Sequence, residues 1–383
     1  MNLAFDLDVY GERQRRVFDR MREQGLDALL VNLPDNLFYL IGNDSIGYIW
    51  RQALILSPAL EEPIFVTRSV EEPAVWQTST VRRAVFYDIV TTDPIQVEVD
   101  LLRQHGLEKG RIGLELEAFT FLPAQHERLT AALPEAEFVD ASELVAEERV
   151  IKSPQEVAYQ RQAGQMANYA MAVVMEALRP GMTEAQVAGI ASKALGDAGS
   201  ELSAIPPLVQ TGRRTTMGHA LPMNVPIAVG DLVAIEFAGV SRRYHAPILR
   251  TAFVGQPPSR LEEDFACLKE AVVAATQAAK AGTPVSEPDQ ATNAVLARRG
   301  LDKRRMHRLG YSIGIAYAPT WLEPMVLAEP DTHTLVPNMS FTIEPNLMNL
   351  DEGWGFKLGD TVLCTEEGGV PLTTFPLDLH VVA

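Results

Sequence analysis

The stretch GDLVAIEFAGVSRRYHAPILRTAFVG (residues 230–255) decides the fold of the second half of the chain. It is typical of two long apolar strands joined by a short polar turn. The first strand carries a single acid, Glu236, and the second carries Pro247. Strand alternation places Glu236 on one face with Ala234 and Ala238, whose small side chains leave space over the carboxylate. Because an isolated buried carboxylate is costly, we expect Glu236 to be paired, protonated or in contact with a ligand.

A purely structural role for Glu236 is the alternative interpretation. An ion pair with a nearby arginine, such as Arg242 or Arg250, would satisfy the carboxylate without any ligand. The apolar residues around Glu236 and the small neighbours on its face favour a functional role, since a binding pocket needs that space.

Two parts of the chain differ in their pattern of predicted elements. Residues 1–150 alternate strands such as DALLVN and RIGLEL with helices, which predicts a three-layer α/β domain around a mixed, largely parallel sheet. Residues 151–383 begin with long helices and continue with strands, which predicts an α+β domain with helices on one side of a sheet. Ser153, Pro154 and Glu156 have the spacing of a capping box, which places the start of the first long helix.

Composition limits the classes of partner. The 383 residues are 47% hydrophobic, and 33 Lys+Arg against 50 Asp+Glu give a net charge of −17. Such a chain repels polyanions, so nucleic acid and anionic membrane are poor partners, whereas a small zwitterion is compatible. The two cysteines, Cys267 and Cys364, belong to no metal-binding or redox motif. Without a signal-peptide pattern or an apolar run of about 20 residues, we predict a soluble cytoplasmic protein.

Several landmarks in order resemble the pita-bread family of creatinase, prolidase, aminopeptidase P and methionine aminopeptidase. They are IKSPQEVAYQRQAG at the domain junction, GHALPMNVPIAVGD around His219, the 230–255 hairpin, RLGYSIGI, WLEP, MSFTIEP and GFKLGDTVLCTEEGGVPLT. The resemblance implies a creatinase-like N-terminal domain over 1–150 and an α+β pita-bread catalytic domain over 151–383. It also implies a homodimer, in which the N-terminal domain and its loop GYIWRQ cap the neighbour's site.

The family's metalloenzymes hold two divalent ions with two Asp, one His and two Glu. By resemblance these five positions fall on Glu236, Pro247, Tyr311, Glu344 and Gly359. Proline and glycine offer no donor, and a neutral tyrosine is a poor ligand for a divalent ion. We therefore expect no metal and no other cofactor, and no activity as an Xaa-Pro peptidase.

Metal-free members of the family include creatinases and ectoine hydrolases, and this chain is more similar to the second group. Gly310-Tyr311 replaces the Gly-His of creatinases and of the metalloenzymes. Glu344 departs from the ectoine hydrolase pattern and is kept in creatinases, and the Lys357-Leu358-Gly359 stretch differs from both groups. The favoured hypothesis is a metal-independent hydrolase that opens a small cyclic amidine, as in the conversion of ectoine to N-acetyl-diaminobutyrate. The alternatives are a creatinase-like amidinohydrolase of a guanidino acid and a non-catalytic pita-bread binding protein.

Four residues are the predicted catalytic set. Glu236 would be an ion-pair partner of the cation or a covalent nucleophile, the latter implied by the resemblance to ectoine hydrolases. Glu344 would activate water or hold the cation, His219 would shuttle protons near working pH, and Tyr311 would donate its hydroxyl.

A second set is predicted to bind the substrate. Trp321 offers a π face to a planar cation, and His245 and Glu323 match polar positions of the metal-free branches. Tyr48 and Trp50 are candidate lid aromatics in the N-terminal domain. No constellation surrounds the remaining histidines, which are predicted to lie on the surface or in loops: His105, His126, His307, His333 and His380.

Overall fold

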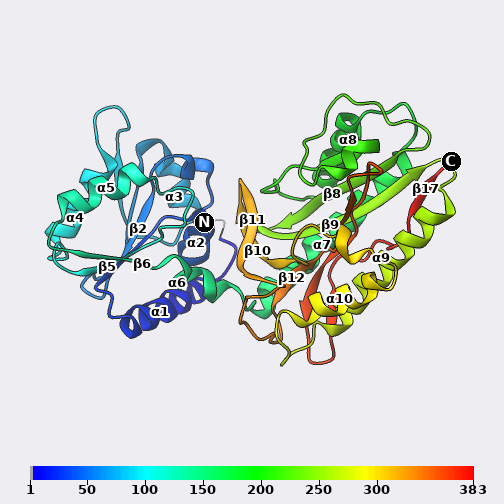
Figure 1. Cartoon of the computed structure of the whole chain (residues 1–383). Coiled ribbons are helices and arrows are strands. Elements are labelled where there is room, and N and C mark those ends of the chain that lie inside the picture. Colours follow the sequence, from blue (N-terminus) through cyan, green and yellow to red (C-terminus); the bar gives the residue numbers. More distant parts are fainter. Residues whose placement is uncertain (1–2) are drawn as a thin grey trace. The chain divides into compact units, whose positions relative to one another are not determined.

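The structure, a computed structural model, describes residues 3–383 (Figure 1). The chain divides into two compact units, Met1–Arg149 and Val150–Ala383. Within the described residues no helix has the length and apolar character needed to cross a membrane.

The first unit is an α/β domain around a six-stranded mixed sheet. Strand order is β4-β3-β2-β1-β5-β6, with β1–β2 and β2–β3 antiparallel and the other pairings parallel. Its strands are β1 (Ala28–Val31), β2 (Ala53–Leu56), β3 (Ile64–Arg68), β4 (Arg83–Tyr87), β5 (Arg111–Leu114) and β6 (Glu137–Asp140). Its α-helices are α1 (Leu7–Glu23), α2 (Pro34–Ile41), α3 (Glu72–Thr78), α4 (Pro94–Gln104), α5 (Pro123–Ala132) and α6 (Ser142–Ala146), with 3-10 turns η1 (Ile46–Ile49), η2 (Ser69–Glu71) and η3 (Glu147–Arg149).

The second unit is built on a nine-stranded sheet covered by helices, which is the α+β arrangement predicted for this half. The main path of the sheet is β11-β10-β12-β15-β9-β8-β7, with β16 on β15 and β17 on β9. The helices are α7 (Pro154–Ala177), α8 (Glu184–Asp197), α9 (Ser259–Ala278) and α10 (Glu287–Ala297), with turns η4 (Gly212–Thr216) and η5 (Asp302–Arg304). The strands are β7 (Leu208–Thr211), β8 (Leu232–Ser241), β9 (Tyr244–Val254), β10 (Tyr311–Tyr317), β11 (Thr320–Val326), β12 (Ser340–Ile343), β13 (Leu347–Asn349), β14 (Trp354–Phe356), β15 (Gly359–Cys364), β16 (Gly369–Pro371) and β17 (His380–Val382).

The capping box predicted at the start of α7 is confirmed. The Ser153 hydroxyl accepts the Glu156 N–H at 3.4 Å, and the Glu156 carboxylate accepts the Ser153 N–H at 2.7 Å, with Pro154 at the first helical position. The first N–H groups of a helix have no preceding turn to supply an acceptor. The Ser153–Glu156 bonds satisfy two backbone N–H groups there, so they fix where the helix begins.

The β8–β9 hairpin turns through Arg242 and Arg243, both with positive φ. Two such residues give the turn a twist that matches the right-handed twist of the strands. The Glu201 carboxylate accepts the N–H groups of Arg242 and Arg243, at 3.2 and 2.9 Å, and so holds this turn in place.

Pro247 stands opposite Ala238 in the β8–β9 ladder, which continues on both sides of it. On the other edge, β9 pairs with β10 at Tyr244 and with β15 from Ile248 onward. Among the described strands none lies opposite Pro247 on that edge, so the proline interrupts no pairing there.

The two faces of β8 have different surroundings. Val233, Ile235 and Phe237 pack in one apolar cluster with residues of α7 and α8. A Cβ at Gly239 would overlap the Ala163 carbonyl of α7, so only glycine allows the helix to lie this close to the strand. Glu236 alternates onto the opposite face, away from these helices.

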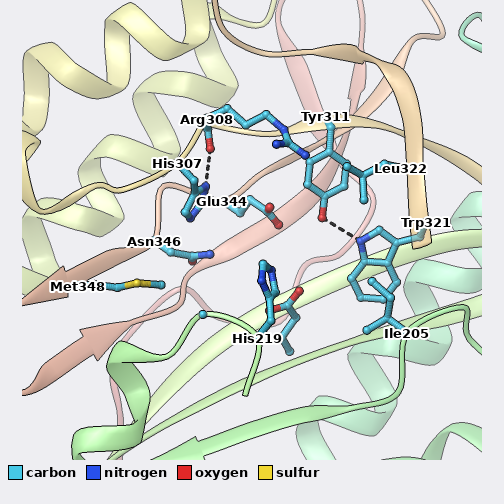
Figure 2. Close-up of a pocket in the computed structure, with 12 residues that line it drawn as sticks. Ile205, His219, His307, Arg308, Tyr311, Trp321, Leu322, Glu344, Asn346 and Met348 are labelled. Atoms are coloured by element: carbon cyan, nitrogen blue, oxygen red, sulfur yellow. Dashed lines mark hydrogen bonds between the residues drawn. The ribbon is translucent and has the colours of Figure 1, made fainter. Parts of the chain in front are cut away.

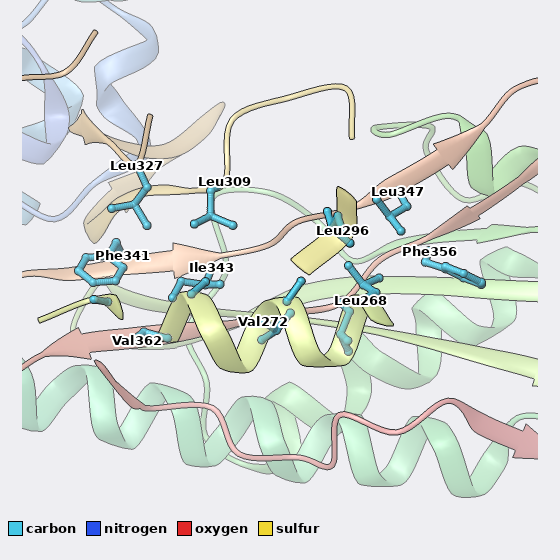
Figure 3. Close-up of a cluster of buried hydrophobic side chains, with 14 of the residues drawn as sticks. Leu268, Val272, Leu296, Leu309, Leu327, Phe341, Ile343, Leu347, Phe356 and Val362 are labelled. Carbon is cyan, nitrogen blue, oxygen red and sulfur yellow. The ribbon is translucent and has the colours of Figure 1, made fainter. Parts of the chain in front are cut away.

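Helices α9 and α10 pack against β12 and β15 in a second apolar cluster (Figure 3). Leu268 of α9 and Leu296 of α10 are fully buried together with Phe341 and Ile343 of β12 and Val362 of β15. Truncating one such leucine to alanine costs about 2–5 kcal/mol of folding free energy. This packing holds β12 in place, and β12 leads directly into the site.

Candidate active site

A pocket of about 210 Å³ lies on the face of the second unit's sheet that carries Glu236. Five predicted residues line it together, His219, Glu236, Tyr311, Trp321 and Glu344. They come from separate segments: the loop after η4, β8, β10, β11 and the residue after β12. Figure 2 shows His219, Tyr311, Trp321 and Glu344 around the same space. Sequence positions more than a hundred residues apart therefore meet in one small cavity.

A buried ion pair fixes Glu236. Lys357 Nζ lies 2.6 Å from Glu236 Oε2 and also donates to the Gly218 carbonyl at 2.6 Å. Glu236 is 5% exposed and Lys357 2%. Glu236 Oε1 has no hydrogen-bond partner among residues 3–383 and belongs to the pocket lining. The ammonium thus balances the charge of the carboxylate through one oxygen and leaves the other for a ligand.

The predicted alternative partners of Glu236 are wrong. Arg250 pairs instead with Asp360 at 2.8 Å, and Arg242 lies in the β8–β9 turn. Lys357 was missed because it is 121 residues from Glu236 and joins it only through the fold.

Glu344 is the second buried acid of the pocket. Burial, reinforced by the charge of Glu236, raises the pKa of Glu344 to about 8, and the cations Lys357 and Arg308 only partly oppose this. Its Oε2 atom has no hydrogen-bond partner in the described part of the chain. At neutral pH the Glu344 carboxyl therefore carries a proton that it can donate.

A hydrogen bond from Trp321 orients the hydroxyl of Tyr311. Trp321 Nε1 donates to the Tyr311 oxygen at 2.8 Å, so the hydroxyl hydrogen points elsewhere. Burial raises the pKa of Tyr311 well above its ordinary value, which keeps the phenol neutral. Tyr311 is therefore a hydrogen-bond donor toward Glu344 or a ligand.

Two histidines lie at the pocket. His219 is exposed on its loop and has no hydrogen-bond partner among the described residues. His307 donates from Nδ1 to the Arg308 carbonyl at 2.6 Å, and burial lowers its pKa, so its neutral ring presents the Nε2 lone pair. The prediction that His307 has no part in a site is corrected. Its position directly before the RLGYSIGI landmark, four residues before Tyr311, was the available signal.

Arg308 and Asn346 also line the pocket and were not predicted. The Arg308 guanidinium lies over the Tyr311 ring, 5.0 Å from its centroid. Asn346 Oδ1 accepts the Leu358 N–H at 3.2 Å, which leaves the amide nitrogen to face the pocket (Figure 2). Both residues offer N–H donors to a ligand, since neither the Arg308 guanidinium nor the Asn346 amide nitrogen donates a hydrogen bond to any of residues 3–383.

Comparison with known proteins gives the family. Residues 158–366 match the family described as Metallopeptidase family M24. Residues 13–151 match the family described as Creatinase/Prolidase N-terminal domain. The chain belongs to metallopeptidase family M24. The predicted pita-bread fold and family are therefore confirmed.

Full-length relatives of this family M24 chain are hydrolases. An ectoine hydrolase of Halomonas elongata is 30% identical, covering 100% of this chain and 99% of that protein. A probable dipeptidase PepE of Mycobacterium bovis is 29% identical, covering 99% and 98%. Among solved structures, the prolidase from Thermococcus sibiricus has a TM-score of 0.89 at 19% identity, with coverages of 99% and 100%, which bears on the fold alone. The dipeptidase PepE from Mycobacterium ulcerans has a TM-score of 0.84 at 27% identity, with coverages of 99% and 99%.

The five positions that hold metal in family M24 metalloenzymes provide few donors here. Tyr311 is neutral and its oxygen accepts from Trp321, while Pro247 has no donor atom. A Cβ at Gly359 would lie 2.5 Å from the Ile343 carbonyl oxygen, so a side chain there requires the backbone to shift. Across residues 3–383 no group of three His, Cys, Asp or Glu residues is placed to hold a metal ion. This donor set does not fit a two-metal centre.

Two residues predicted to contact the substrate, His245 and Glu323, do not do so in this family M24 chain. His245 is fully buried, with Nε2 accepting the Ala204 N–H at 3.0 Å and Nδ1 donating to the Arg243 carbonyl at 2.8 Å. Burial lowers the pKa of His245 to about 4. Glu323 is paired with Lys152 at 2.5 Å and accepts from Ser312 at 2.8 Å. Neither residue lines the pocket, because the polar atoms of both side chains bond to other residues inside the fold.

The predicted lid aromatics Tyr48 and Trp50 lie in the first unit. Tyr48 is buried edge-on against Phe119, with ring centroids 6.1 Å apart. Trp50 is 42% exposed, and the Arg68 guanidinium lies 4.5 Å from its ring centroid. Their role at a partner's site stays a prediction.

Proposed function

We propose that this protein is a metal-independent hydrolase that opens a C–N bond of a small cyclic amidine of the ectoine kind. The observation that carries the proposal is the Lys357 ammonium, 2.6 Å from Glu236 within the site. It supplies a positive charge where family M24 metalloenzymes hold cations. Pro247 and Gly359, which offer no donor at two further metal positions, support the same conclusion.

The size and lining of the pocket favour a small planar cation. Its volume of about 210 Å³ lies below the roughly 300–1,000 Å³ of pockets for drug-sized ligands. Trp321 and Tyr311 offer aromatic surface, which attracts a planar cation, and Glu236 Oε1 is open to its N–H groups. The similarity to an ectoine hydrolase supports a cyclic amidine as the substrate.

The side chains supply each proton transfer that amidine hydrolysis requires. The oxygen of a water molecule adds to the amidine carbon, and the water gives a proton to His219. Glu344 donates its proton to one ring nitrogen, and the bond from carbon to that nitrogen breaks. The hydroxyl left on carbon returns a proton to Glu344 as the amide carbonyl forms, and His219 passes its proton to the released amine. Glu236 Oε1 holds the amidinium N–H throughout.

Incubation of the purified protein with ectoine tests the proposal. Substrate loss and primary-amine formation are followed with and without chelator, with creatine and an Xaa-Pro dipeptide as parallel substrates. We expect the ectoine ring to open at the same rate with and without chelator. A ligand at a hundred times its dissociation constant should also stabilise the protein by about 2.7 kcal/mol. Turnover of the dipeptide alone, and only with added Mn²⁺, would overturn the proposal.

Two further readouts define the chemistry. Turnover of creatine but not ectoine would favour the second candidate, a guanidino-acid hydrolase, which the retained Glu344 makes the natural alternative. Rapid-quench mass spectrometry distinguishes attack by water, which leaves the chain unmodified, from direct attack by Glu236, which leaves a substrate adduct on that residue.

A further inference from the structure

We propose that Arg308 binds a carboxylate of the substrate at the opening of this pocket and so selects zwitterionic ligands over purely cationic ones. The inference rests on the proposed function for the cationic half of the ligand. It adds the residue that recognises the anionic half.

Arg308 differs from the other arginines of its segment. Arg304 pairs with Asp351 at 3.2 Å, and Arg305 pairs with Asp289 at 2.5 Å. Arg308 has no acid within ion-pair distance among residues 3–383, although it is exposed and lines the pocket. Its guanidinium is instead held over the Tyr311 ring, which leaves its N–H groups for an anion.

The charges of the pocket leave Arg308 uncompensated. The Glu236 carboxylate is already balanced by Lys357 at 2.6 Å. Glu344, the other acid of the lining, is protonated at neutral pH because burial raises its pKa. An amidinium alone would add a second unbalanced positive charge, whereas a ligand that also carries a carboxylate cancels it.

The position of Arg308 relative to the reacting groups is fixed by the backbone. Leu309 is fully buried in the apolar cluster beneath the sheet, and its carbonyl accepts the Glu344 N–H at 2.9 Å. Figure 2 shows Arg308 and Glu344 facing the same space, with Tyr311 beside them. A fixed backbone spacing between Arg308 and Glu344 suits a ligand whose carboxylate is attached to the reacting ring.

Two ligands that differ only in a carboxylate test the inference. They are ectoine and the same ring without its acid group, 2-methyl-1,4,5,6-tetrahydropyrimidine. Binding of each is measured by calorimetry to wild type, Arg308→Met, Arg308→Lys and the control Arg304→Met. We expect Arg308→Met to weaken ectoine binding roughly tenfold or more and to leave binding of the acid-free ring unchanged. Arg308→Lys should lie between, because it keeps the charge but loses the planar fork.

Kinetics give an independent readout. Arg308→Met should raise KM for ectoine while kcat stays within a few-fold, since the carboxylate is not the reacting group. The Arg304→Met protein should match wild type with both ligands. Equal loss of affinity for both ligands in Arg308→Met, or tight binding of the acid-free ring by wild type, would overturn the carboxylate contact but not the proposed function. Failure of wild type to bind either ring would overturn both.

Discussion

Exchange of Glu236 for glutamine separates chemistry from stability at the centre of the site. The amide is nearly isosteric with the carboxylate, so the change removes charge and keeps shape. It leaves the Lys357 ammonium, 2% exposed, with only neutral acceptors, the new amide oxygen and the Gly218 carbonyl. Breaking a buried ion pair by removing one partner costs about 3–5 kcal/mol. For a unit of this size that lowers the melting midpoint by roughly 6–20 °C.

The same exchange should lower turnover per folded molecule by about 10²–10⁴, the usual contribution of a positioned acid, base or nucleophile. Because lost stability alone can mimic lost activity, two further variants are needed. Glu236→Gln with Lys357→Met removes both charges, so much of the stability should return while turnover stays low. Glu323→Gln breaks the equally buried pair with Lys152 outside the pocket, so it should cost stability and spare turnover.

Melting midpoint and single-turnover rate are measured on the same samples below the lowest midpoint. If the double variant recovers turnover together with stability, Glu236 acts only through its ion pair, and the reasoning that places it in the chemistry is refuted. If Glu323→Gln loses turnover as severely as Glu236→Gln, rigidity of the unit rather than the carboxylate controls the rate.

Three other predictions concern the ionisation of Glu344, the absence of metal and the oligomeric state. The pKa of Glu344 is raised from 4.5 to about 8, so the folded chain holds an extra proton between these values; stability should fall as pH rises through this window, and activity should fall above about pH 8. Glu344→Gln should abolish turnover and flatten the pH dependence of the urea midpoint; an unchanged slope contradicts this. Elemental analysis should find no stoichiometric Mn, Zn, Co or Fe, and two ions per chain would contradict metal independence. Light scattering should give a homodimer of 42.1 kDa chains, and a fully active monomer would exclude a site shared between subunits.

Local sequence patterns were sufficient to predict the parts of the fold in which the interacting residues are close together in the sequence. Alternation along β8 correctly placed Glu236 on the face of Ala238, opposite the apolar cluster that holds Val233, Ile235 and Phe237. The Ser153 capping box marked the start of α7 because all its partners lie within one turn. These patterns are short-range, so tertiary structure did not alter them.

Interactions that join distant segments were not predictable in the same way. Lys357 meets Glu236 only after β14 and β8 come together, and nothing in either segment specifies the partner. His245 shows the converse failure. Matching spacing favoured it as polar lining, but the sequence could not show that Ala204 and Arg243 satisfy both ring nitrogens first.

The residues at the five metal positions, and the Lys357 ammonium beside Glu236, bear on which bond this site can cleave. A neutral peptide carbonyl needs strong polarisation before water attacks it, and a pair of divalent ions provides that in a metallopeptidase. Lys357 carries one charge, and Glu236 already neutralises it at 2.6 Å. A site built this way polarises little, so its substrate must bring its own electrophilic carbon. An amidinium does so, because its positive charge is shared with the carbon that water attacks. The proposed chemistry thus needs only what the pocket has: an open carboxylate oxygen on Glu236, a proton on Glu344 and the imidazole of His219.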